Sequence, residues 1–223
     1  MSALELAGER VELLSARALY RPAQRTLLIA DPHWGKAASF RARSLPIPEP
    51  IAADLARLTT ALGATGAERL VILGDCVHAR DGLDASVLVA VERWRSAHHS
   101  LAIDLVRGNH DRRAGDPPAA WGFAVHATLD APPFAYRHEP QTGDLYTLAG
   151  HIHPAVRLVG RGSAGLRAPC FWFGARCGVL PAFGSFTGCA EVAPKPRDRV
   201  FVVGTQVVEI ERAARSRSRV DPG

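Results

Sequence analysis

Residues 99–111 read HSLAIDLVRGNHD, an apolar run that ends in a glycine followed by an amide, an imidazole and a carboxylate. A turn needs the glycine, but it does not need those three functional groups in succession. Two earlier stretches have the same design: 25–33, RTLLIADPH, and 67–78, AERLVILGDCVH. Short runs of Leu, Ile and Val closed by polar residues are typical of central strands in a sheet that is covered on both faces. We therefore predict three such strands.

The segments between these runs have helical periodicity. They are 48–65, PEPIAADLARLTTALGAT, and 84–100, DASVLVAVERWRSAHHS. Alternating strands and helices predict an α/β core with right-handed crossovers. From residue 121 onward, β-rich segments cut by Gly and Pro follow, such as 168–174, APCFWFG, and 198–210, DRVFVVGTQVVEI. They predict a second, more antiparallel sheet packed on the first, so the expected fold class is α/β with two packed mixed β-sheets flanked by helices.

The chain has 223 residues, of which 47% are hydrophobic and 22% charged, as in an ordinary globular protein of one domain. We predict a single domain over 1–211 and a basic tail at 212–223. The net charge is +5. The positive charges come almost entirely from arginine, because Lys36 and Lys195 are the only lysines. Codon bias of a GC-rich genome is one explanation. A phosphate-rich partner is the other, because guanidinium groups match phosphate with two parallel hydrogen bonds.

The cysteines and the termini indicate the compartment. The four cysteines form no CxxC pair, and reduced thiols in a cytosolic protein account for them most simply. The first twenty residues carry acids and no sustained apolar segment, so they do not resemble a signal peptide. No apolar run approaches the length of a membrane span. We expect a cytoplasmic protein that does not associate with membranes.

Unusual polar residues collect where the apolar runs end. They are Asp31 and His33, Asp75 and His78, Asn109 to Asp111, His138, and His151 with His153. In open α/β sheets, sites form beyond the carboxyl ends of the strands, so these residues are expected to converge. Carboxylate, imidazole and amide ligands together suit Mn, Fe or Zn better than Ca or Mg. There are more candidates than one ion needs, which favours two ions that share a carboxylate.

The motifs D-x-H, G-D, G-N-H-D, a single His and G-H-x-H occur in that order between residues 31 and 153. In this the chain resembles the calcineurin-like metallophosphoesterase superfamily, which implies an αββα sandwich. The stretches at 33–48 and 180–188 are also similar to a bacterial subgroup, the ligase-associated DNA damage response phosphoesterases. Ser44 and Cys189 stand where that subgroup has glycine. The likeness implies a DNA endonuclease in repair that is functionally associated with a DNA ligase, a helicase and an exonuclease.

The resemblance also implies roles for individual residues. Two triads each hold one ion: Asp31, His33 and His153 the first, and Asn109, His138 and His151 the second. Asp75 bridges two divalent transition metal ions, with Mn as first choice and Fe or Zn as alternatives. A water bridging the ions, with its pKa lowered by them, would attack phosphorus as hydroxide. His110 would protonate the leaving oxygen or stabilise charge on the phosphate, and Asp111 would orient His110 through a hydrogen bond. The alternative for Asp111 is to cap a helix that starts at DRRAG, residues 111–115.

Basic residues around these motifs are candidates for substrate binding. They are Lys36, Arg41, Arg43, His78, Arg80, Arg107 and Arg112. Cations interleaved with Trp34 suit single-stranded DNA, which stacks its bases on aromatic rings. A solvated helix face with Trp34 packed inward is the alternative. We interpret the aromatic residues in 168–174 as structural, or as part of a surface for homo-oligomerisation.

Two other functions compete with a DNA endonuclease. The same scaffold serves phosphatases and phosphodiesterases of small nucleotides or other non-DNA substrates, and the core motifs do not separate them. A non-catalytic scaffold in a repair complex is the second alternative. The ligand set is complete and His110 is present, which speaks against loss of catalysis.

Overall fold

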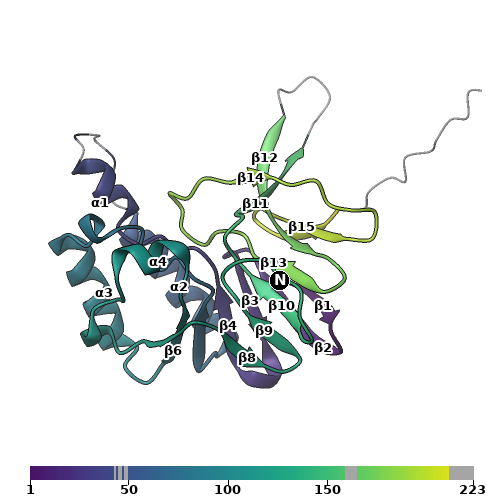
Figure 1. Cartoon of the computed structure of the whole chain (residues 1–223), viewed down its shortest axis with the longest axis horizontal. Coiled ribbons are helices and arrows are strands. Elements are labelled where there is room, and N and C mark those ends of the chain that lie inside the picture. The colour runs from purple at the N-terminus through teal and green to yellow at the C-terminus, as the bar shows by residue number, and fades with distance from the viewer. Residues whose placement is uncertain (43, 45–46, 48–49, 159–164, 211–223) are drawn as a thin grey trace, which may run out of the picture.

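The structure is a computed structural model that describes residues 1–42, 44, 47, 50–158 and 165–210 (Figure 1). Arg43 and the predicted tail at 212–223 lie outside the described residues. Two β-sheets pack face to face, and the helices gather beside the first of them, on the left of Figure 1. The predicted fold class, α/β with two mixed sheets and flanking helices, is confirmed.

The first sheet contains the three predicted parallel strands at its centre. Its strands are β1 (Ser2–Leu6), β2 (Glu9–Leu14), β3 (Ala18–Arg21), β4 (Thr26–Ile29), β5 (Arg69–Ile72), β6 (Ala102–Val106) and β7 (Ala124–His126), in that order across the sheet. Neighbours from β1 to β4 are antiparallel, and those from β4 to β7 are parallel. β1 to β3 lie outside the elements predicted from the sequence. Ala7 and Gly8 connect β1 to β2, and both have positive φ, as two-residue hairpin turns require.

Helices cover one face of this sheet. They are α1 (Lys36–Arg41), α2 (Ile51–Thr65), α3 (Ala85–Ala97) and α4 (Asn109–Ala114), with short 3₁₀ turns η1 (Pro22–Gln24), η2 (Arg80–Gly82) and η3 (Ala119–Trp121). Leu58 of α2 and Val91 of α3 share a buried cluster with Ile29 of β4. Its neighbour Leu28 points the other way, into the core between the sheets. Burial of both faces explains why β4 is apolar at consecutive positions.

The second sheet is built by the second half of the chain. Its strands are β8 (Leu129–Ala131), β9 (Phe134–Tyr136), β10 (Tyr146–Ala149), β11 (Pro154–Leu158), β12 (Leu166–Phe173), β13 (Cys177–Val179), β14 (Ala190–Glu191), β15 (Arg199–Val203) and β16 (Val207–Glu209). The main order is β14-β11-β12-β13-β10-β9-β8, and β15 pairs with β12 and β16. Phe171 and Phe173 point into the core between the sheets, whereas Trp172 lies with the cluster on the outer face. No described helix follows residue 121.

A buried arginine links the two sheets. Arg21 of β3 is only 1% exposed, and it makes a bidentate ion pair with Glu9 of β2 at 2.7 and 2.6 Å. The same guanidinium donates to the hydroxyl of Tyr136 on β9 and to the carbonyl of Ala131 on β8. A buried charge needs this full set of partners, so the contact fixes how the sheets sit on each other.

Parallel pairing places the carboxyl ends of β4, β5 and β6 side by side. The loop after β10 joins them from the second sheet, where the backbone N–H of His151 donates to Asp31 Oδ2 at 2.8 Å. The polar residues that follow all four strands therefore meet at one edge of the sandwich. Among the described residues, no helix is long and apolar enough to span a membrane.

Candidate metal centre

The first predicted triad is assembled in the structure. Ligand-type atoms of Asp31, His33 and His153 lie within 4.8 Å of one another. His153 Nε2 is 3.4 Å from His33 Nε2 and 3.5 Å from Asp31 Oδ1. Asp31 is fully buried, and its Oδ1 has no hydrogen-bond partner among the described residues. An unpaired buried carboxylate oxygen is unfavourable, and a cation held between these three residues would satisfy it.

The second predicted triad faces the first. His138 Nε2 is 2.9 Å from Asn109 Oδ1 and 3.1 Å from His151 Nδ1. His138 Nδ1 donates to the carbonyl of Leu73, since a carbonyl oxygen only accepts, and this leaves Nε2 with a lone pair. Two acceptor atoms at 2.9 Å repel each other unless a cation lies between them. The donor set therefore fits a divalent metal ion.

Asp75 lies between the two triads. Its Oδ2 is 3.8 Å from His33 Nε2, and its Oδ1 is 3.5 Å from His138 Nε2. Oδ1 also accepts the backbone N–H of His110 at 2.8 Å, which fixes the plane of the carboxylate. All seven predicted metal ligands are thus brought together, and their arrangement suits two ions with Asp75 as the shared ligand.

The backbone at these ligands is in an unusual conformation. Five of them have positive φ: Asp31, His33, Asp75, His151 and His153, with values from 47 to 71°. Non-glycine residues in this region cost on the order of 1–3 kcal/mol each and cluster at functional sites. Five strained residues at one place indicate that the fold is held in this shape for the sake of the site.

Two glycines allow the loops to approach the ligands closely. A Cβ on Gly108 would collide with the carboxylate and backbone of Asp75, and a Cβ on Gly74 would collide with the ring of His138. Gly108 has φ −88° and ψ 179°, which any residue can adopt. The glycine of the G-N-H-D motif is therefore needed for close approach to Asp75 and not for a special backbone conformation.

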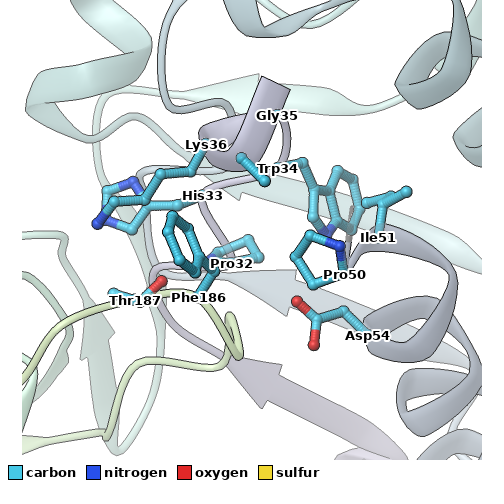
Figure 2. Close-up of a pocket in the computed structure, with 11 residues that line it drawn as sticks. Pro32, His33, Trp34, Gly35, Lys36, Pro50, Ile51, Asp54, Phe186 and Thr187 are labelled. Atoms are coloured by element: carbon cyan, nitrogen blue, oxygen red, sulfur yellow. The ribbon is translucent and has the colours of Figure 1, made fainter. Parts of the chain in front are cut away.

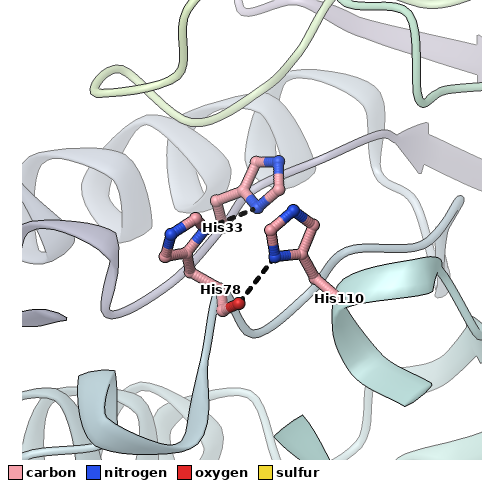
Figure 3. Close-up of side chains that lie close together, drawn as sticks. All are labelled: His33, His78 and His110. Carbon is pink, nitrogen blue, oxygen red and sulfur yellow. Dashed lines mark hydrogen bonds between the residues drawn. The ribbon is translucent and has the colours of Figure 1, made fainter. Parts of the chain in front are cut away.

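A third group of histidines lies next to the first triad (Figure 3). The ring of His110 stacks on that of His78, with centroids 4.7 Å apart, and lies edge-on to His33 at 4.9 Å. His110 Nδ1 lies 2.7 Å from the backbone carbonyl of His78 and donates to it. This bond fixes the tautomer, so Nε2 is the ring nitrogen left for chemistry.

Asp111 does not make the predicted hydrogen bond to His110, and that prediction is wrong. The Asp111 carboxylate is 1% exposed and accepts the backbone N–H groups of Val77 at 3.1 Å and Gly108 at 2.9 Å. Burial raises the pKa of Asp111, and the two backbone hydrogen bonds oppose that effect. Asp111 caps the start of α4 and ties it to the loop after β5, so it acts on His110 only through the backbone.

Burial keeps two histidines of this centre, His33 and His78, neutral. It lowers the pKa of His33 to about 2, with the nearby His153 and His110 adding to the effect. It lowers the pKa of His78 to about 4, and the adjacent His110 contributes. Metal ions bind neutral imidazole, so His33 is in the state that ligation requires at neutral pH.

The predicted substrate-binding residues differ in their surroundings. Lys36 lies beside His33 on the rim of the centre (Figure 2), and burial lowers its pKa. Arg80 is exposed at the start of η2, close to His78 in the chain. Three arginines are already paired with carboxylates: Arg41 with Asp84, Arg107 with Asp116, and Arg112 with Glu139. Their contact with substrate stays a prediction, as does that of Arg43.

Trp34 does not offer a ring to a nucleic acid. It is 2% exposed and packs edge-on against Trp121, as the inward-facing alternative proposed. The cavity beside it, between His33 and Asp54 (Figure 2), has a volume of about 10 Å³. That is room for one water molecule at most. Trp172 lines a large groove instead, although the sequence interpretation treated it as structural or as part of a surface for homo-oligomerisation.

One solved structure is similar over nearly the whole chain. The nuclease MPE from Pseudomonas putida is 42% identical in sequence, with a TM-score of 0.84, over 94% of this chain and 99% of that one. The phosphoesterase Yfce from E. coli aligns over 83% of this chain and 97% of that one, at 14% sequence identity and a TM-score of 0.41. No family model and no curated protein matches the chain.

Proposed function

The chain belongs to the calcineurin-like metallophosphoesterase superfamily and is a metal-dependent phosphoesterase, and from this premise we propose that it is a manganese-dependent endonuclease of single-stranded DNA. The observation that carries the proposal is the convergence of two ligand triads on the two oxygens of Asp75. Likeness to a nuclease over nearly the full length supports a phosphodiester of nucleic acid as the substrate.

The proposed ligands would hold two divalent ions. When bound, such ions supply Lewis acidity toward the phosphate and lower the pKa of water. Asp31, His33 and His153 form one site, Asn109, His138 and His151 form the other, and Asp75 belongs to both. Asn109 contributes a neutral oxygen, which limits the negative charge that an anionic substrate meets. Mixed nitrogen and oxygen donors suit manganese, with iron or zinc as alternatives.

His110 is proposed as the general acid. Its Nδ1 hydrogen is engaged by the carbonyl of His78, so Nε2 is the atom that would carry a proton to the leaving oxygen. The stacked ring of His78 holds His110 in place. Lys36, on the rim of the centre, would attract the phosphate.

The biological setting follows from the resemblance alone. Similarity to the ligase-associated subgroup supports a role in DNA repair, in functional association with a DNA ligase, a helicase and an exonuclease. The arginine-rich composition supports a phosphate-rich partner.

The test is incubation of manganese-loaded protein with circular single-stranded DNA, beside the Asp75→Ala variant and with bis(4-nitrophenyl) phosphate as a generic diester. A circle has no ends, so a linear product requires internal cutting. Linear DNA that forms only with the unaltered protein is the expected result. Hydrolysis of the generic diester without DNA cleavage would overturn the DNA assignment and favour a small nucleotide substrate. Failure to hydrolyse either one would overturn the enzyme assignment.

A further inference from the structure

We propose that a groove on the outer face of the second sheet binds an unpaired base of single-stranded DNA together with its flanking phosphates. The inference rests on the proposed function and specifies which part of the surface recognises the strand. The groove has a volume of about 710 Å³ and is bounded by Ile152, Trp172 and the segment 195–198. We call it the Trp172 groove.

The Trp172 groove adjoins the metal centre. Ile152, which lines it, stands between His151 and His153, one ligand from each triad. His151 is exposed, so the centre opens to solvent on this side. A DNA strand with one phosphate at the metal centre can therefore place a neighbouring nucleotide in the adjoining groove.

The ring of Trp172 is held in an orientation that suits stacking on a base. Alternation along β12 turns it away from the core that holds Phe171 and Phe173, and it packs against the cluster around Val200 on the outer face. Its indole N–H donates to Asp198 Oδ2 at 2.8 Å, which fixes the ring plane. Among the described residues, no aromatic ring stacks on it. A fixed aromatic surface beside a groove is the element that single-strand binding proteins offer to bases.

The rim of the groove is positively charged. Arg176, Lys195 and Arg197 are exposed there, and within the described chain Lys195 and Arg197 form no ion pair with a carboxylate. The only acidic residue of the lining, Asp198, is occupied by the indole of Trp172 and by the backbone N–H of Lys195 at 2.7 Å. Uncompensated cations around an aromatic floor complement a phosphate backbone with unpaired bases.

Charge also argues against a second copy of the chain as the occupant. A twofold contact through the Trp172 groove would place the three cations of one copy against those of the other. A DNA duplex does not fit the groove in this way either, because its bases are stacked and paired. The groove therefore favours single strands over duplexes.

Fluorescence tests the contact directly. The other three tryptophans are buried, with Trp34, Trp94 and Trp121 at 2, 6 and 0% exposure, so Trp172 alone can stack on an added base. The manganese-loaded His110→Ala variant is titrated with an oligothymidylate. Quenching of the indole emission is expected. This quenching should vanish in the double variant that combines His110→Ala with Trp172→Phe. Binding of the oligonucleotide that leaves the emission unchanged would overturn the proposal.

Kinetics separate this contact from catalysis. Loss of one base–aromatic stack should lower kcat/KM on circular single-stranded DNA roughly 5- to 150-fold in Trp172→Ala. Trp172→Phe should recover most of the activity, and bis(4-nitrophenyl) phosphate, too small to reach the groove, should be hydrolysed at an unchanged rate. Lys195→Ala/Arg197→Ala should lower the salt dependence of DNA binding by roughly 0.7 logarithmic units per lost phosphate contact. Arg93→Ala, an exposed arginine on α3, is the matched control.

The outcomes distinguish the two proposals. DNA cleavage unaffected in Trp172→Ala, with activity on both substrates intact, overturns the groove assignment and leaves the endonuclease standing. Equal losses on DNA and on the generic diester indicate a damaged fold, and Trp172→Phe then decides, because a stacking role requires that it restore DNA cleavage. A change in oligomeric state in Trp172→Ala, with DNA binding unchanged, identifies the groove as a subunit contact and overturns the proposal.

Discussion

At the scale of single residues, two backbone carbonyls set the chemistry of two histidines. Leu73 accepts from His138 Nδ1 at 3.0 Å, and His78 accepts from His110 Nδ1 at 2.7 Å. Each bond leaves Nε2 as the ring nitrogen available for other interactions. His138 Nε2 thereby presents a lone pair beside the oxygens of Asp75 and Asn109, where a cation would bind, whereas His110 lies outside both triads. The same type of hydrogen bond therefore orients a proposed metal ligand in one place and the proposed general acid in the other.

Mutations can separate the proposed catalytic role of His110 from the capping role of its neighbour Asp111. His110→Ala should lower DNA cleavage by about 10²- to 10⁴-fold, the usual contribution of a general acid, while bound manganese stays unchanged. Asp111→Asn retains an acceptor for only one of the two backbone N–H groups, so it should lower the free energy of unfolding by about 1–2 kcal/mol. Metal analysis, DNA cleavage and denaturant unfolding of both variants are the measurements. A loss of activity in Asp111→Asn as deep as in His110→Ala would contradict the capping role.

Gly108 tests how closely the loops must pack around Asp75. Gly108→Ala places a methyl group on the Asp75 carboxylate, so manganese affinity and DNA cleavage should each fall at least about tenfold. Gly63→Ala is the matched control, because Gly63 lies within α2 and a methyl group there meets open space. That variant should be more stable by roughly 0.5–1 kcal/mol and fully active. Manganese titration and thermal unfolding check both expectations, and normal metal binding by Gly108→Ala would refute the argument.

At the scale of elements, the buried strands and the long helices could be predicted from the sequence, whereas the ion pairs between side chains of different elements could not. β4, β5 and β6 and helices α2 and α3 follow from apolar runs and helical periodicity, and the structure confirms them. β1 to β3 were missed, although the stretch 2–14, SALELAGERVELL, has the alternation of a hairpin around Ala7 and Gly8. The arginine pairs were out of reach, because Arg112 and its partner Glu139 are brought together only by tertiary folding.

One such partnership makes stability depend on pH. Asp104 of β6 accepts from Arg69 on β5 at 2.7 Å and contacts His126 on β7 at 2.6 Å, so it ties three parallel strands together. Burial alone would raise the pKa of Asp104, but these hydrogen bonds hold it below its usual value. The stabilisation is therefore complete above the ordinary aspartate pKa and is lost as the pH falls through the lowered one.

The matching prediction is that Asp104→Asn loses about 1–2 kcal/mol of unfolding free energy at pH 7. The difference from the unaltered protein should shrink once the pH falls below about 3.8, the ordinary pKa of aspartate. Urea unfolding of both proteins between pH 3 and pH 7 measures it. A difference that is constant across this range would show that the carboxylate charge is not what ties the strands.

At the scale of the molecule, the candidate metal centre lies where the two sheets meet. Four proposed ligands follow strands of the first sheet and three follow strands of the second. That they converge was predictable, because parallel strands end at one edge. The Trp172 groove was not predicted, although the alternation of Phe171, Trp172 and Phe173 already shows that the middle ring faces away from the other two.

Because both sheets contribute ligands, metal removal should weaken the whole fold. Without ions, Asp31 Oδ1 is unsatisfied and the acceptors of Asn109 and His138 face each other at 2.9 Å. Manganese at about 100 times its Kd should add about 2.7 kcal/mol to the stability. For a chain of this length that corresponds to a rise in Tm of roughly 5–11 °C. Calorimetry with manganese and with a chelator measures the shift, and Asp75→Ala should show a smaller one, since it removes the ligand common to both triads. Stoichiometric manganese binding with an unchanged Tm would mean that the metal does not join the sheets.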